Sequence, residues 1–403
     1  MADRQNRRPA ERQIARVMRK PEQPEQANFL ELFFDLAFIF ALTRVTLPLI
    51  DRLDVVGAAQ MLVLLLALFW LWSFTAWVTN YFNPESSEIQ LLTIVSMLGA
   101  VLMAAAEPRA FADQGMLFAG TYVAVHIGRT LAIVYLLRAD ERRLNPTRIL
   151  FWFGVSAVPW IAGALNSDST ARLALWAVAL AVDYTGGRLL WPTPKLGRVP
   201  TSQWVFAPEH LAERYRQFYV IALGETIFIL GRTLFYNDLT AARMAAFVVA
   251  FTTTALMWRI YIQRAGRIMG EAIRRSAQPN RLGRSIANTH LLMVIGIVFT
   301  AVGYGLVIGE PLGHTDLSWL GPILGGPALF IVGRARFEWA VFSRVSPSRL
   351  VALVVIAALA APLLLGPPLL VTVTAATVLT GMAVADARRA RGCPPEKPSP
   401  PRR

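Results

Sequence analysis

The stretch from Asn28 to Thr46 reads NFLELFFDLAFIFALTRVT, and it places Glu31, Asp35 and Arg44 in an apolar run long enough to enter a bilayer. Glu31 and Asp35 are four residues apart, so on a helix they lie about 40° apart and share one face. An ionised side chain in hydrocarbon costs at least about 2.5 to 3.5 kcal/mol. We therefore expect a proton, a cation or a basic partner to neutralise these carboxylates.

The composition indicates an all-α, polytopic transmembrane helix bundle. Of the 403 residues, 55% are hydrophobic and 16% are charged, whereas soluble domains carry about 25% charged residues. The single cysteine, Cys393, excludes an intramolecular disulfide. The net charge of +14 lies between the apolar runs, so it predicts topology and no nucleic-acid partner.

Apolar segments of the length that a membrane-spanning helix requires recur along the chain. Twelve spans are predicted, at 29–50, 55–79, 89–106, 114–137, 148–165, 171–190, 214–236, 240–262, 289–309, 316–333, 349–365 and 368–386. Ten or eleven spans remain open if one segment is re-entrant or interfacial. Two spacings, Gly305-x-x-x-Gly309 and Gly321-x-x-x-Gly325, predict close helix packing.

The distribution of basic residues predicts the topology. With the N-terminus inside, inner segments hold 33 of the 40 Lys and Arg, and the outer loops hold 5. Because these side chains resist translocation, both termini are expected in the cytoplasm. Residues 1–28 are expected to be a loosely ordered basic cytoplasmic leader, and 387–403 a disordered Pro-rich cytoplasmic tail.

The chain is expected to contain two six-helix halves, 29–200 and 201–386. An offset of 201 residues aligns the segment Arg143-Leu-Asn-Pro-Thr-Arg148 with Arg344-Val-Ser-Pro-Ser-Arg349. Since each half has an even number of spans, the halves would be parallel repeats related by an axis along the membrane normal.

A second apolar span, Pro208 to Tyr236, carries Glu225 near its middle. Its partner must be a proton or a group from another span, because the charged residues on its own face are several turns away. Near the start of this span His210, Glu213 and Arg214 form a polar motif at the inner interface.

Three further ionisable residues lie well inside apolar runs: His126, Arg129 and Asp183. A buried arginine keeps its proton, so Arg129 is expected to pair with Asp35, Asp183 or Glu225. The alternative is structural. Such ion pairs can serve simply to fix helix register, and the residues of the interfacial motif can be ordinary polar residues at the membrane interface.

Several kinds of site are not expected. The spacing His210-x-x-Glu213 could supply two metal ligands, but with four histidines and no second pair a metal centre is disfavoured. No phosphate loop, nucleophile elbow or zinc-protease helix is present, so the sequence favours a non-enzyme without a cofactor. The aromatic residues Phe69, Trp70, Trp72, Phe74 and Trp77 surround a whole helix, which favours lipid or bundle contacts.

The chain resembles the bacterial low temperature requirement protein A (LtrA) family. The resemblance rests on Glu31-Leu-Phe-Phe-Asp35-Leu-Ala-Phe-Ile-Phe-Ala-Leu-Thr43, on His210-Leu-Ala-Glu213-Arg214 and on Ile221-Ala-Leu-Gly-Glu225. Members commonly have Ser after the last Glu, where this chain has Thr226. The resemblance implies a many-spanning protein of the bacterial cytoplasmic (inner) membrane, linked to growth at low temperature and without a settled activity. The first of these segments is also similar to the Phe-Ser-Asp helix of potassium channels built from six-helix repeats, with Phe34 in place of Ser.

These observations lead to a transport-type protein that is coupled to protons or cations. Asp35 and Glu225 would exchange the proton or cation, Arg129 would be the counter-charge, and Glu31, His126 and Asp183 would line the path. The alternatives are a six-helix-repeat channel, a lipid-related membrane enzyme or stress sensor with His210, Glu213 and Arg214 at its interface, and a purely structural bundle. The expected partners are the lipid bilayer and a small solute or ion that the sequence does not name; a homo-oligomer is left open.

Overall fold

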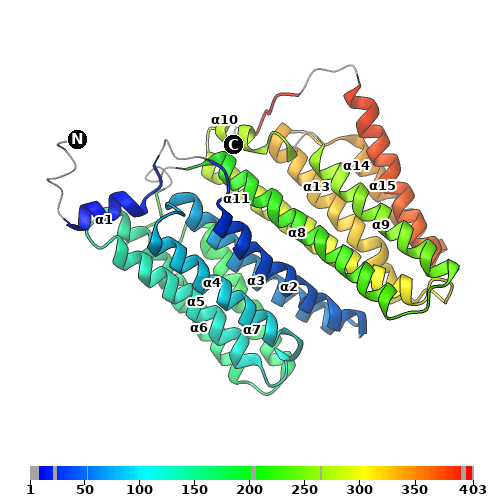
Figure 1. Cartoon of the computed structure of the whole chain (residues 1–403), viewed down its shortest axis with the longest axis horizontal. Coiled ribbons are helices and arrows are strands. Elements are labelled where there is room, and N and C mark those ends of the chain that lie inside the picture. The colour runs from blue at the N-terminus through cyan, green and yellow to red at the C-terminus, as the bar shows by residue number, and fades with distance from the viewer. Residues whose placement is uncertain are drawn as a thin grey trace. The chain divides into compact units, whose positions relative to one another are not determined.

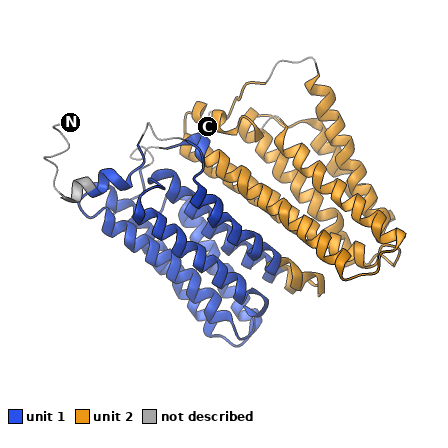
Figure 2. Ribbon diagram, viewed as in Figure 1, with its two compact units in different colours: residues 1–44, 59–210 blue, residues 45–58, 211–403 orange. Residues whose placement is uncertain are grey.

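The computed structural model describes residues 9–20, 25–51, 53–200, 206–263, 266–391 and 396–401. In these ranges the regular elements are helices, with no β-strand (Figure 1). The chain divides into two compact units: residues 1–44 and 59–210 form unit 1, and residues 45–58 and 211–403 form unit 2 (Figure 2).

Unit 1 contains the first seven helices, in which α4, α5, α6 and α7 pack in sequence order. The helices are α1 (Pro9–Val17), α2 (Phe29–Asp51), α3 (Val55–Tyr81), α4 (Ser87–Ala106), α5 (Gly115–Leu136), α6 (Leu144–Leu165) and α7 (Ser169–Arg188), with short 3-10 turns at Glu107–Arg109 and Glu141–Arg143. The end of α2 and the start of α3 belong to unit 2, and the first residues of α8 belong to unit 1.

Unit 2 is built around α11, which packs against α9 and α13, while α15 packs against α9 and α14. Its helices are α8 (Pro208–Phe235), α9 (Ala241–Ile262), α10 (Met269–Arg275), α11 (Pro279–Gly309), α12 (Leu317–Leu320), α13 (Gly326–Phe342), α14 (Pro347–Leu363) and α15 (Pro368–Ala390), with a π-helical turn at Gly321–Gly325.

The helix starts follow from local sequence. Proline is the first residue of α8, α11, α14 and α15, where its missing N–H costs no intrahelical hydrogen bond. The Asp168 carboxylate caps α7 by accepting hydrogen bonds from the backbone N–H groups of Thr170 (3.1 Å) and Ala171 (3.0 Å).

Each of the twelve predicted segments is largely helical, and ten stretches in the described chain are long and apolar enough to cross a membrane. These are the stretches of α2 to α6, α8, α9, α11, α15 and the stretch Leu317–Phe342. Of the two remaining helices, α14 has 17 residues, and α7 carries Arg172 and Asp183. The chain is therefore a polytopic helical membrane protein.

Close helix packing occurs at one of the four glycines in the predicted spacings, because a Cβ added to Gly305 would lie 2.7 Å from Ile50 Cδ1 of α2. In the described chain a Cβ added to Gly309 or Gly321 would meet open space. A further close approach lies between α11 and α13, where a Cβ on Gly296 would lie 2.5 Å from the backbone nitrogen of Phe330. The prediction is thus confirmed for Gly305 only, because the spacing does not show which face of a helix meets its neighbour.

Parts of both terminal segments form helix or hydrogen-bonded contacts in the described ranges. Within the leader, residues 9–17 form α1, with Ile14 and Val17 buried. In the tail, α15 continues to Ala390, and beyond it the backbone N–H of Ser399 donates to the carbonyl of Val341 (3.0 Å). Residues 1–8, 21–24, 392–395 and 402–403 of these segments lie outside the described ranges.

Candidate functional site

The first turn of α2 holds Glu31 in a capping box. The backbone N–H of Asn28 donates to Glu31 Oε2 (2.8 Å), and Asn28 Oδ1 accepts from the N–H of Leu30 (3.3 Å). This reciprocal bonding satisfies N–H groups that have no intrahelical partner. It also fixes the Glu31 carboxylate, of which only 1% is exposed, at the start of the helix.

The same carboxylate pairs with His210 in the first turn of α8. His210 Nε2 lies 3.0 Å from Glu31 Oε2 and 3.1 Å from Oε1, and the imidazole is fully buried. The basic partner expected for the carboxylates of α2 thus reaches Glu31 from a residue 179 positions away in the chain.

Hydrogen bonds of Asn80, at the end of α3, determine which ring nitrogen of His210 carries a hydrogen. Its Nδ2 donates to the Ala207 carbonyl (2.7 Å), and its Oδ1 accepts from the Ala207 N–H (3.3 Å). Because this peptide fixes the amide orientation, Nδ2 also donates to His210 Nδ1 at 3.2 Å. His210 Nδ1 is then an acceptor, and Nε2 carries the hydrogen that it donates to Glu31.

Asp35 lies one turn further along α2 and is also buried. Trp72 of α3 donates its indole N–H to Asp35 Oδ1 at 2.8 Å. The side chain of Trp72 is fully buried, which agrees with the bundle contact expected from the aromatic cluster.

Arg129 of α5 is buried beside uncharged groups. One terminal nitrogen donates to Thr75 Oγ1 (2.8 Å) and the other to His126 Nδ1 (3.0 Å), while the guanidinium lies 4.6 Å from the centre of the Phe74 ring. No carboxylate within the described ranges forms an ion pair with it. The predicted pairing of Arg129 with Asp35 or Asp183 was therefore wrong, and its pairing with Glu225 of unit 2 stays a prediction.

Asp183 of α7 accepts a hydrogen bond from the Tyr122 hydroxyl at 2.8 Å. Tyr122 precedes His126 by one helical turn, and the centres of their rings are 4.4 Å apart. These contacts place Asp183, Tyr122, His126 and Arg129 in one buried cluster of unit 1.

The other predicted site residues belong to unit 2. Glu225 is fully buried on α8, and the hydroxyl of the next residue, Thr226, lies 2.9 Å from that of Thr254. Arg214 is buried and donates to Gln217 Oε1 (2.9 Å), while Glu213 is half-buried. Across the described ranges, no three His, Cys, Asp or Glu side chains are grouped as metal ligands.

The residues that sequence reasoning missed are neutral partners and one cation from the leader. Asn80 directly follows a predicted span, which is a weak signal, and no signal in the sequence marks Tyr122. Arg19 is buried, and its guanidinium donates to the Thr79 carbonyl at 3.0 Å. Burial lowers the pKa of Arg19, and the negative charges of Glu31 and Glu25 act in the opposite direction.

Comparisons with known proteins agree with the sequence pattern. The family model of the bacterial low temperature requirement A protein (LtrA) matches residues 26–384. An uncharacterized protein of Rhizobium meliloti (strain 1021) is 36% identical over 325 residues, which cover 80% of this chain and 79% of the relative. No solved structure matches the chain. The match spans both units and every predicted site residue, so the chain belongs to the bacterial low temperature requirement A protein family.

Proposed function

We propose that this protein is a proton- or cation-coupled transport protein of the bacterial cytoplasmic (inner) membrane. The observation that carries the proposal is the buried Glu31–His210 pair. The solute is a small molecule or ion of unknown identity.

The pair is suited to exchange one positive charge. Asn80 occupies His210 Nδ1, and Nε2 already carries a hydrogen, so the imidazole is neutral and the pair carries the charge of Glu31. A further proton is accommodated best on the Glu31 carboxylate, since protonating Nδ1 would break the bond from Asn80. Uptake of this proton changes the charge of the Glu31–His210 pair from −1 to 0. Ionisable groups inside membranes commonly serve as proton relays.

The remaining buried polar residues would extend this site into a path. Asp35 lies one turn from Glu31, and Asp183, His126 and Arg129 form a second cluster in the same unit. In unit 2 the corresponding candidate is Glu225, which we propose as a second exchanging carboxylate.

The proposed arrangement has twelve spans in two parallel six-helix repeats, with both termini in the cytoplasm. In support, α7 packs against α6, and α14 packs against α15. The partners α6 and α15 are each long enough to span the membrane. The excess of basic residues in the inner segments favours this orientation.

The test is flux through proteoliposomes that contain the purified full chain. A trapped pH indicator would report proton movement when members of a panel of solutes and ions are added with and without a pH gradient. Glu31→Gln and His210→Gln should reduce coupled flux to that of empty liposomes, because glutamine forms hydrogen bonds but cannot carry the mobile proton.

Matched controls come from exposed residues of the same types. Glu310→Gln and His314→Gln alter exposed side chains of the loop after α11 and should leave flux unchanged. Size-exclusion profiles and thermal unfolding of all four variants would show whether they are folded. Wild-type flux in folded Glu31→Gln and His210→Gln proteins would overturn the proposal.

A further inference from the structure

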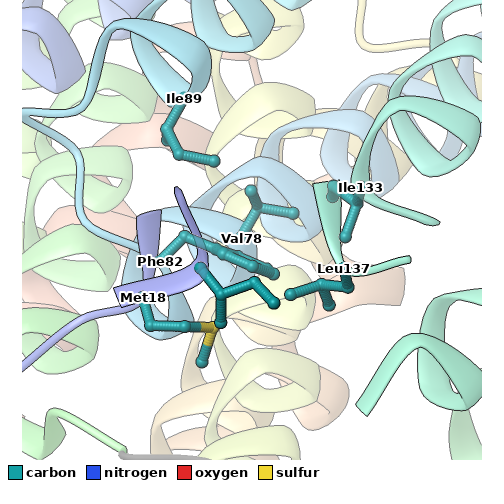
Figure 3. Packing of buried hydrophobic residues seen from close by; sticks show 7 residues of the cluster. Met18, Val78, Phe82, Ile89, Ile133 and Leu137 are labelled. Carbon is teal, nitrogen blue, oxygen red and sulfur yellow. The ribbon is translucent and has the colours of Figure 1, made fainter. Parts of the chain in front are cut away.

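An apolar cluster holds the described part of the leader against the other helices of unit 1. Ile14 and Met18 are buried, and they pack with residues from the end of α3, the start of α4 and the end of α5 (Figure 3). The partners in this cluster are Val78, Phe82, Ile89, Ile133 and Leu137. Burial of two long apolar side chains favours the docked state of α1.

Backbone pairing continues the contact beyond α1. Met18 and Phe82 form an antiparallel bridge, and the N–H of Asn83 donates to the Val17 carbonyl at 2.8 Å. The N–H of Arg19 donates to the Tyr81 carbonyl at 3.2 Å. The leader therefore has a defined register along the end of α3.

This register places the Arg19 guanidinium at the end of α3, next to the residue that bonds to His210. Arg19 donates to the carbonyl of Thr79, the residue before Asn80, and is only 4% exposed. Its charge interacts with those of Glu31 and Glu25. A positive charge beside a carboxylate favours the ionised form of that carboxylate.

We propose that residues 9–20 are a latch that places Arg19 as a removable counter-charge beside Glu31. With the latch docked, Glu31 stays ionised. When the latch is released, Arg19 moves away and Glu31 accepts a proton more readily. The leader therefore regulates protonation of Glu31. Its role in transport rests on the proposed function.

The outer contact of the latch can be broken easily. Arg16 pairs with Glu88, but the Arg16 side chain is 61% exposed. Exposed ion pairs contribute little and are screened by salt. The docked state therefore depends on the apolar cluster and the backbone pairing.

The test follows modification of Glu31 by dicyclohexylcarbodiimide, which reacts with protonated carboxyl groups in membranes. Mass spectrometry of the full chain in proteoliposomes measures the rate and requires no flux. Arg19→Gln should accelerate modification of Glu31 about tenfold, because an adjacent opposite charge shifts proton affinity by about one unit or more. Arg109→Gln, which removes an exposed arginine in the 3-10 turn after the C-terminal end of α4, is the matched control and should change nothing.

A second set of variants controls docking directly. Ile14→Asp places a charge in the apolar cluster, so it should release the latch and accelerate modification as Arg19→Gln does. Adding Met18→Cys and Phe82→Cys, with Cys393→Ser, would close the latch again on oxidation, because paired residues of an antiparallel bridge have the spacing of a disulfide. Oxidation should slow modification, and a reductant should restore the fast rate.

The outcomes separate the two proposals. If Ile14→Asp accelerates modification but Arg19→Gln does not, the leader covers Glu31 only sterically and the counter-charge role is overturned. If neither does, the latch itself is overturned. If both do while no solute moves in the wild type, the proposed transport function fails and the latch stands.

Discussion

Arg349 in unit 2 and Arg129 in unit 1 are both buried arginines, with 1% and 4% of their surfaces exposed, but their surroundings differ. Arg349 pairs with two carboxylates: its Nε lies 3.2 Å from Glu338 of α13, and its Nη1 donates to Asp386 of α15. Arg129 instead donates to the neutral side chains of Thr75 and His126.

Under the proposed function, the difference separates a structural charge from a functional one. Arg349 lies at the start of α14, so its two ion pairs join three helices, and Ser346 donates a further hydrogen bond to Glu338. Arg129 joins helices through uncharged groups and lies 4.6 Å from the centre of the Phe74 ring. Because a buried cation without a carboxylate is expensive in a membrane, the proposed function assigns this charge to the transport path.

The largest expected effect is that of Arg349→Met. Removing the guanidinium leaves two buried carboxylates without their cation, and breaking a buried pair in this way costs about 3 to 5 kcal/mol. Chemical unfolding of the purified protein in detergent would measure the loss.

Two variants calibrate that result. Arg344→Gln breaks an ion pair with Glu396 in which the arginine is 45% exposed, so it should cost no more than about 1 kcal/mol. Adding Glu338→Gln and Asp386→Asn to Arg349→Met should recover part of the loss, since the two carboxylates are then neutral while the buried Arg334, whose charge interacts with both, remains. Equal losses for Arg349→Met and Arg344→Gln would refute the structural role.

A smaller effect is expected from Tyr122→Phe in unit 1. The change removes the hydroxyl that donates to Asp183 and leaves a buried acceptor atom without this donor. The expected loss in unfolding free energy is about 1 to 3 kcal/mol. Tyr135→Phe, at a side chain that is 63% exposed, is the control and should change little. A loss as large as that of Arg349→Met would mean that the two units do not differ in the way described.

The same contrast shows what sequence alone could predict. Burial of Glu31 and Asp35 follows from their place in an apolar run, because hydropathy acts locally. The partner of Glu31 does not follow, because it depends on which helices are neighbours. Pairing Arg129 with Asp35 or Asp183 by counting charges failed because a hydroxyl and an imidazole satisfy its donors instead.

The fold was predictable to a similar extent. Each predicted span is largely helical because twenty apolar residues have no other way to satisfy their backbone in lipid. The leader was harder to predict because Ile14, Val17 and Met18 are few among many charges, and their contacts lie far away in the chain. The predicted internal repeat and the count of twelve spans remain predictions.

The smallest effect on stability is expected from Arg129→Met, and it decides the comparison. The change removes hydrogen bonds to Thr75 and His126 but also removes a desolvated cation, so the two contributions offset to within about 1 kcal/mol. Under the proposed function the same protein should show no coupled flux in proteoliposomes, and Arg129→Lys should restore some of it. A loss of stability as large as that of Arg349→Met would mean that Arg129 has a charged partner in the native protein and is structural too. Unchanged stability with full flux would remove Arg129 from the path, because neither the fold nor transport would then require its charge.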